Sequence, residues 1–219
     1  MVENDPRNKG VEDITDVSPH ILQMIEHFFA TYKDLEGKEA WSKVEPCLGR
    51  ETALKELGES IIMYNESVAG EVPDPRAGTL KPPDFWHASI QPSKSSWLPD
   101  GTPATGFPER VSVYIEVPAT TNNKYEFDHV SGMLQLDRVL HSAVFYPLDY
   151  GFIPQTLCED EDPLDILVLG SNALPVGSMV DVRVLGMMDM EDEKGGDCKV
   201  LGVIHNDPMY AHITEFEQV

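Results

Sequence analysis

The segment VSVYIEV, residues 111–117, alternates apolar with polar or amphipathic side chains, as half-buried β-strands do. Turn sequences such as Ser131-Gly132 and Pro175-Val176-Gly177 separate it and the later segments of strand character. These later segments are residues 124–128, 133–140, 164–169, 179–187 and 198–204. Because no long helical pattern lies between them, the sequence predicts a small closed barrel, mainly β, rather than a parallel sheet.

Two helices are expected ahead of the barrel. Ser18-Pro19 is a typical helix start, and apolar residues then recur every three or four positions as far as Tyr32. Gly37 is the expected end of this helix. A second amphipathic pattern covers residues 51–66 and is followed by Gly70. We expect both helices to pack against the outside of the barrel.

The chain divides into three blocks that together form a single domain. Residues 71–110 contain eight of the 17 prolines and show no periodicity, which predicts an irregular connector. A helical segment, residues 1–70, precedes this connector. The β-barrel catalytic core is expected at residues 111–219.

The charge of the chain disfavours two classes of partner. Its 38 acidic residues against 16 basic ones give a formal charge of -22, which disfavours nucleic acids and anionic membrane surfaces. The three cysteines form no CxxC pair, so we expect a reducing compartment, the cytoplasm, with an organelle as the alternative. Residues 1–10 lack the features of a secretory signal, and a soluble protein is expected.

Acidic residues concentrate at two turns of the expected barrel. The segment EDEDPLD, residues 159–165, leads directly into an apolar strand, so Asp160, Asp162 and Asp165 could converge on one point. The turn at residues 189–197 adds Asp192 and Asp197. An ordinary solvated loop is the alternative interpretation of either run.

Convergence of these five carboxylates would require cations. Each like-charged pair at about 4 Å costs on the order of 4 kcal/mol at an effective dielectric constant near 20. Summed over the cluster, this repulsion could exceed the stability of a typical domain, which is roughly 5–15 kcal/mol. Oxygen ligands without histidine or thiolate select hard ions, so the sequence favours Mg²⁺, with Mn²⁺ or another divalent ion as alternatives.

Basic side chains interrupt the apolar faces of the expected strands. Each of these residues, Lys124, Arg138 and Lys199, could lie at a barrel rim or bridge to a nearby carboxylate, but the three together indicate an anionic ligand. Together with carboxylate-held metals they favour hydrolysis of a small phosphate-bearing substrate by a metal-activated water. The sequence lacks the GxxxxGK[ST] and GxSxG motifs, which argues against a P-loop enzyme and an α/β-hydrolase.

Residues 159–165 match the D-x-D-P-x-D signature of the soluble family I inorganic pyrophosphatases, which the chain resembles. Further motifs of this family match at residues 32–35, 115–118, 124–126, 137–138, 145–151 and 192–199. The resemblance implies hydrolysis of inorganic diphosphate to two orthophosphates with Mg²⁺. It also implies an OB-like five-stranded barrel with flanking helices and a homo-oligomer, of which the order stays open.

The resemblance also assigns roles to individual residues. Asp160, Asp165 and Asp197 would hold a first pair of metal ions, and Asp162 would help to deprotonate the attacking water. Metal ions that arrive with the substrate would bind Asp192 and Glu116, and Glu126 would support the metal site. Five further residues would contact phosphate or the metal shell: Tyr32, Lys33, Lys124, Arg138 and Lys199. Tyr146 and Tyr150 would line the pocket and orient acidic groups.

The order of the blocks departs from the family. The motif with Tyr32 and Lys33 follows the barrel in the family but precedes it here, so a circular permutation is predicted. A short repeat supports it, because Asn4-Asp5-Pro6 and Asn206-Asp207-Pro208 each precede an Ile-Thr pair. Whether Tyr32 and Lys33 reach their own chain's pocket stays open. Two other functions also stay open: a non-catalytic divalent-cation-binding barrel, and an OB-type oligonucleotide binder.

Overall fold

A closed five-stranded barrel forms the centre of the protein, as the sequence predicts. The structure is a computed structural model that describes residues 13–33, 43–67, 109–128, 131–141, 143–192 and 195–210. The barrel strands are β3 (Arg110–Val117), β6 (Asp149–Phe152), β7 (Asp165–Leu169), β8 (Met179–Met188) and β11 (Lys199–Ile204). They pair in the order β3-β6-β7-β11-β8, and β8 pairs again with β3 to close the ring. Only the β7–β11 pair among these is parallel.

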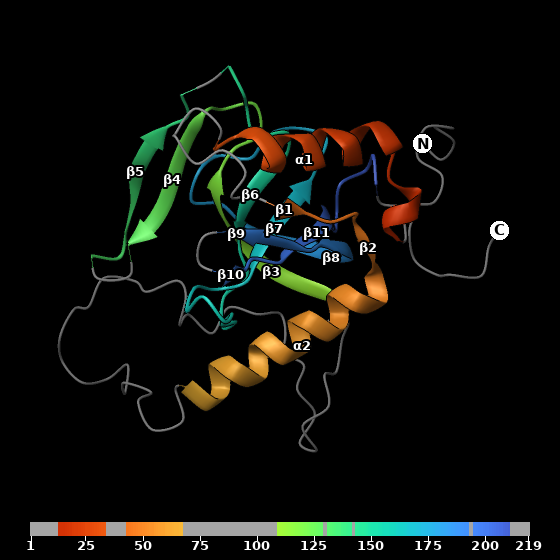
Figure 1. Cartoon of the computed structure of the whole chain (residues 1–219), viewed down its shortest axis with the longest axis vertical. Helices are drawn as coiled ribbons and strands as arrows, with labels where there is room; N and C mark the ends of the chain where they lie inside the picture. Colours follow the sequence, from red (N-terminus) through yellow and green to blue (C-terminus); the bar gives the residue numbers. More distant parts are fainter. Residues whose placement is uncertain are drawn as a thin grey trace.

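The set of barrel strands differs from the prediction in one respect. Strands β4 (Asn123–Asp128) and β5 (Met133–Val139) form a separate two-stranded hairpin, which stands to one side of the barrel in Figure 1. The fifth barrel strand is β6 instead, which the sequence analysis missed. Its four residues are too few to show an alternating pattern.

Short strands complete the sheets. β2 (Leu48–Gly49) adds to the barrel beside β8. A small sheet contains β1 (Lys43–Val44), β9 (Met190–Asp192) and β10 (Gly195–Gly196). Through its pairing with β9, β1 links the N-terminal segment to the region that directly precedes β11.

The two predicted helices cover opposite sides of the barrel (Figure 1). Helix α1 (Pro19–Thr31) starts with the predicted proline, but the Ser18 side chain makes no capping hydrogen bond. The helix ends at Thr31, ahead of the predicted Gly37, which lies outside the described residues. Helix α2 (Arg50–Ser67) agrees with its prediction within a residue at either end. In the described part of the chain, no helix is long and apolar enough to cross a membrane.

Strand periodicity divides the core into two hydrophobic clusters. In β7, Ile166 and Val168 belong to the cluster that contains α2 residues, whereas Leu167 and Leu169 belong to the cluster beneath α1. Both faces of β7 are therefore buried, which explains its continuous apolar sequence. The same alternation places the first residue of β7, Asp165, on the α1 side. The site described next lies on that side.

Candidate active site

Strand pairing brings an acid and a base together at one end of the barrel. The parallel pair β7–β11 places Lys199 beside Asp165, the first residue of each strand. Lys199 shares a face of β11 with Leu201 and Val203, which pack under α1. Lys199, which interrupts this apolar face, therefore lies beside a carboxylate, one of the arrangements that the sequence allows for it.

The end of α1 supplies two more polar groups to the same place. The Tyr32 amide donates to the Phe28 carbonyl oxygen at 2.9 Å, so Tyr32 and Lys33 directly follow the last turn. Rings fix this end of the helix: Phe28 stacks on Tyr32 with centroids 5.3 Å apart and tilts against Tyr146 at 4.7 Å. Tyr32 and Lys33 are therefore placed in the pocket of their own chain.

Buried hydrogen bonds shape the acidic loop between β6 and β7. The hydroxyl of buried Thr156 accepts from the Leu164 amide at 2.8 Å and donates to the Ile153 carbonyl at 2.6 Å. Within the loop, the Asp162 amide donates to Asp160 Oδ1 at 3.2 Å. These bonds hold the backbone that carries Asp160 and Asp162, although both side chains remain accessible.

Helix α2 also supports this loop. The Leu157 amide donates to the carbonyl oxygen of Ser60 at 3.0 Å, which ties the loop to the middle of the helix. Cys158 then donates its amide to the Asp162 carbonyl at 2.9 Å and closes the turn. The helix on the far side of the barrel thus takes part in positioning the acidic residues.

A cavity of about 440 Å³ brings together all the predicted site residues except Asp192. The described part of Asp192 is its backbone in β9, and its side chain lies outside the described residues. The predicted residues that line the cavity are Tyr32, Lys33, Glu116, Lys124, Glu126, Arg138, Tyr146, Tyr150, Asp160, Asp162, Asp165, Asp197 and Lys199.

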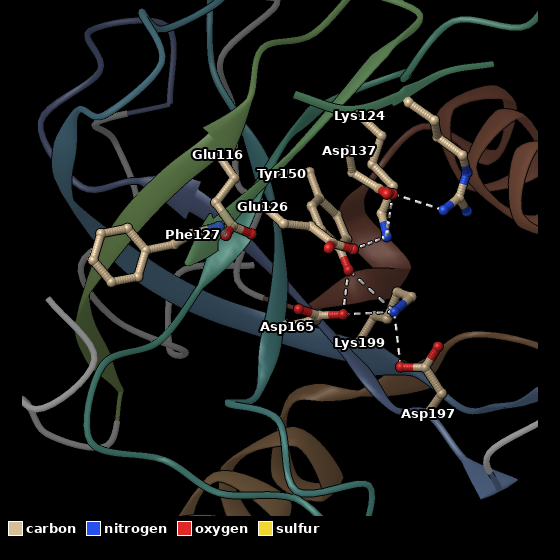
Figure 2. A network of polar contacts seen from close by, with 10 residues as sticks. Glu116, Lys124, Glu126, Phe127, Asp137, Tyr150, Asp165, Asp197 and Lys199 are labelled. Atoms are coloured by element: carbon tan, nitrogen blue, oxygen red, sulfur yellow. Dashed lines mark hydrogen bonds and ion pairs between the residues drawn. The ribbon is translucent and has the colours of Figure 1, made fainter. Parts of the chain in front are cut away.

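Lys199 is the centre of one polar network in the cavity (Figure 2). Its Nζ lies 2.8 Å from Asp165 Oδ2 and 2.8 Å from Asp197 Oδ1. The Tyr150 hydroxyl donates to the same oxygen of Asp165. Burial lowers the pKa of Lys199, but the two carboxylates outweigh it and hold the pKa well above its usual value. Burial and the nearby Asp165 charge raise the pKa of Tyr150, so both donors stay protonated.

A second network lies on the β4–β5 hairpin (Figure 2). Lys124 bonds to Glu126 on the same strand and lies 3.6 Å from Asp137 on β5. Arg138 Nη1 donates to the same Asp137 oxygen at 2.7 Å. A register shift after Lys124 interrupts the alternation of β5 and leaves Arg138 opposite Lys124. Two cations therefore face the cavity from neighbouring positions.

Glu116 is the most deeply buried carboxyl group in the cavity lining. Its residue is 8% exposed, and Oε1 accepts from the Phe127 amide at 2.7 Å. Burial, with a further contribution from the charge of Asp165, raises its pKa to about 8. Without an added cation, this carboxyl group therefore keeps its proton near neutral pH.

The raised pKa of Glu116 predicts a pH dependence of stability in chelator. Between pH 4.5, its ordinary pKa, and about pH 8, the folded protein holds a proton that the unfolded chain loses. The unfolding free energy is thus expected to fall as pH rises through this window, by up to about 4 kcal/mol. The variant Glu116→Gln should lose this part of the decline in urea unfolding with EDTA at pH 5 to 8. Equal slopes in both proteins would contradict the assignment.

The sequence analysis missed some residues that shape the site. Asp137, which contacts both Lys124 and Arg138, lies in the matching family motif at residues 137–138, but the sequence indicated no role for it. Phe29 lines the cavity, and its ring centroid lies 5.4 Å from Lys199 Nζ. The one sequence signal for Asp137 was its place directly before Arg138, a residue of opposite charge. Phe29 looks in the sequence like an ordinary core residue of α1.

The donor set fits hard divalent cations. Asp160, Asp165 and Asp197 provide only carboxylate oxygens, and such ligands suit Mg²⁺ or Mn²⁺. Among the side chains that the structure describes, no three acids, histidines or cysteines converge as a ready-made metal site. Instead, Lys199 joins two of the three carboxylates. All three cysteines are free thiols.

Comparisons with known proteins identify the family. The model of the family described as "Inorganic pyrophosphatase" matches residues 1–65 and 113–219. Among similar proteins, the inorganic pyrophosphatase of Thermus thermophilus is 54% identical over 122 residues, which are 56% of this chain and 68% of that protein. That of Saccharolobus solfataricus is 43% identical over 119 residues, 53% of this chain and 69% of that protein.

A solved structure is also similar. The crystal structure of the Thermus thermophilus enzyme gives a TM-score of 0.49 at 54% sequence identity, covering 51% of this chain and 64% of that one. The chain thus spans about two thirds of the length of these relatives. The matched ranges of the family model include both the α1 segment and the barrel, which together build the cavity. The chain belongs to the inorganic pyrophosphatase family.

Proposed function

We propose that this protein hydrolyses inorganic diphosphate to two orthophosphates and that it does so with Mg²⁺. The observation that carries the proposal is the composition of the one cavity described above. It combines acidic groups of the barrel and its loop with Lys33, which follows α1, and with Lys124 and Arg138 of the hairpin. A small, highly charged anion accompanied by cations satisfies both sets of groups.

The basic groups would bind and orient the substrate. Lys124 and Arg138 lie on neighbouring positions of the hairpin, where they would neutralise charge on the phosphoryl oxygens. The same charges would stabilise the leaving orthophosphate as negative charge builds up on it. Asp137 contacts both side chains and would hold them in position before the substrate arrives.

The acidic groups would hold cations and accept a proton. Asp160, Asp165 and Asp197 would bind Mg²⁺, which when bound polarises phosphoryl oxygens and lowers the pKa of a bound water. Asp162 is exposed to the cavity while its backbone is fixed by the loop, so its carboxylate can accept the proton of the attacking water. Tyr150 would keep Asp165 in place through its hydrogen bond.

Orthophosphate release from diphosphate tests the proposal directly. We expect release with millimolar Mg²⁺ and none above background when EDTA exceeds the metal. ATP and a phosphate monoester, assayed in parallel, measure the preference for diphosphate. A folded protein that binds Mg²⁺ and yet releases no orthophosphate would exclude this function.

A further inference from the structure

Lys199 is the most deeply buried of the cations that line the cavity. Its residue is 2% exposed, and its ammonium group lies 5.4 Å from the ring centroids of both Phe29 and Tyr150. Two rings and two carboxylates thus lie around it, and Figure 2 shows the carboxylates together with the Tyr150 ring. A buried ammonium requires paired charges and hydrogen bonds to remain in such a place. Asp165 and Asp197 provide both.

The same carboxylates belong to the donor set for divalent cations. Asp165 Oδ2 accepts from Lys199 Nζ at 2.8 Å and also from the Tyr150 hydroxyl. A carboxylate oxygen offers about two lone-pair positions, so these two donors saturate it. Asp197 Oδ1 likewise accepts from Lys199 at 2.8 Å. A divalent cation that binds these side chains must therefore share them with an ammonium group or replace it.

Position in the fold makes this arrangement rigid. Asp165 and Lys199 are paired in register at the start of adjacent strands, and Asp197 is two residues before Lys199. The backbone amide of Asp197 donates to the Met190 carbonyl at 2.7 Å, which fixes the backbone of Asp197 as well. The side chains of Asp165 and Asp197 are 25% and 16% exposed, so they are open to the cavity while Lys199 lies behind them.

From this geometry we propose that Lys199 is a positioning residue, an internal counter-cation that holds Asp165 and Asp197 together and lowers their affinity for divalent cations. The inference deepens the proposed function, since it takes these carboxylates as metal ligands. It has two consequences. The acidic residues stay folded together in the absence of a metal ion, and metal binding stays weak enough to be reversible because the site carries a permanent positive charge.

The variant Lys199→Met tests both consequences, because methionine keeps an unbranched side chain without the charge. We expect Mg²⁺ to bind at least tenfold more tightly in isothermal titration calorimetry, since its repulsion by a neighbouring cation is removed. We also expect a lower melting temperature in EDTA, because two carboxylates lose their partner. Ca²⁺ serves as a second probe ion in the same titration.

Lys124→Met is the matched control. It removes one positive charge from the same cavity, but Lys124 pairs with Glu126 and Asp137 rather than with Asp165 and Asp197. We expect its Mg²⁺ affinity to change less than threefold. Unchanged or weaker Mg²⁺ binding by Lys199→Met, or an equal gain in the control, would overturn the proposal.

If the Lys199→Met protein depends on Mg²⁺ for folding, each such case has its own measurement. A Lys199→Met protein that unfolds in EDTA and refolds on addition of Mg²⁺ supports the proposal, and its affinity is then read from the refolding midpoint. Should that variant not fold even in Mg²⁺, Lys199→Gln enters the same titration with the same expectation. Orthophosphate release by the unmodified protein is a separate measurement, so failure of the proposed function and failure of this inference are distinguishable.

Discussion

The Asp162→Asn variant is expected to release orthophosphate from diphosphate 10²- to 10⁴-fold more slowly than the unmodified protein, about the contribution of a general base. Its fold should be unchanged, since the Asp162 side chain is exposed while its backbone groups make the loop contacts. Steady-state assays at saturating Mg²⁺ measure the effect, and a fall in kcat with little change in KM is the expected form.

Glu161→Gln is the control for this variant. It removes the same charge from the neighbouring position of the same loop, yet Glu161 does not line the cavity. Its left-handed backbone, with φ of 69°, should cost glutamine about as much as glutamate, since the two side chains have nearly the same shape. We expect less than a threefold change. If both variants lost activity equally, the loss would come from the charge of the loop and not from a missing proton acceptor. If the protein were a non-catalytic cation-binding barrel, neither substitution should change its Mg²⁺ binding.

Gly151→Ala is expected to destabilise the fold by more than about 3 kcal/mol, beyond the usual cost of overpacking. A Cβ atom at this position would lie 1.9 Å from the backbone oxygen of Tyr114. That oxygen cannot retreat, because Tyr114 is on β3, which pairs with β6 on one side and β8 on the other. Gly151 also follows Tyr150 directly, so any shift of β6 disturbs the donor to Asp165.

Gly58→Ala provides the opposite expectation with the same chemical change. Gly58 lies within α2, and a Cβ atom there would meet nothing within 4 Å. Alanine should therefore stabilise the helix by roughly 0.5–1 kcal/mol. Urea unfolding in Mg²⁺ measures both variants. A Gly151→Ala protein with an unchanged urea midpoint would show that β3 and β6 can separate without cost.

Sequence periodicity predicted the parts of the fold in which local pattern and burial agree. The apolar run of β7 follows from the burial of both its faces. The alternation in β3 correctly indicated a strand, but the expectation that this strand is half-buried was wrong, because Ser112, Tyr114 and Glu116 on its more polar face are buried as well. The hairpin of β4 and β5 has strand periodicity too, yet periodicity carries no information about which strands pair. Four-residue β6 closes the barrel through long-range pairing with β3 and β7, for which no local signal exists.

Part of the candidate site could be predicted because charged side chains on an apolar strand face, or close to like charges, cost free energy unless a partner of opposite charge lies nearby. A lysine on an apolar strand face needs a carboxylate nearby, and Lys199 has two. The acidic run around Asp160 was predicted to bind cations for a similar reason, and that part stays a prediction. The hairpin partner Asp137 and the loop-supporting Thr156 were not predictable, because their roles depend on contacts between segments distant in sequence.

Other expectations stay predictions. The proline-rich connector, apart from its last residues, lies outside the described residues, and so do Asn4-Asp5-Pro6 and the second Ile-Thr pair of the repeat. The circular permutation and self-association are likewise untested. The position of Tyr32 and Lys33 in the cavity of their own chain is compatible with a permuted order of the blocks.

The place of α1 in the chain has a consequence for synthesis on the ribosome. Phe28 and Phe29 pack in the same cluster as Leu201 and Val203, which are translated last among the core residues. Helix α1 therefore leaves the exit tunnel well before the β11 residues with which it packs, and part of its apolar face stays uncovered until they have emerged. Chaperones that shield nascent hydrophobic segments would have more time to engage it than they would a helix encoded downstream of the barrel.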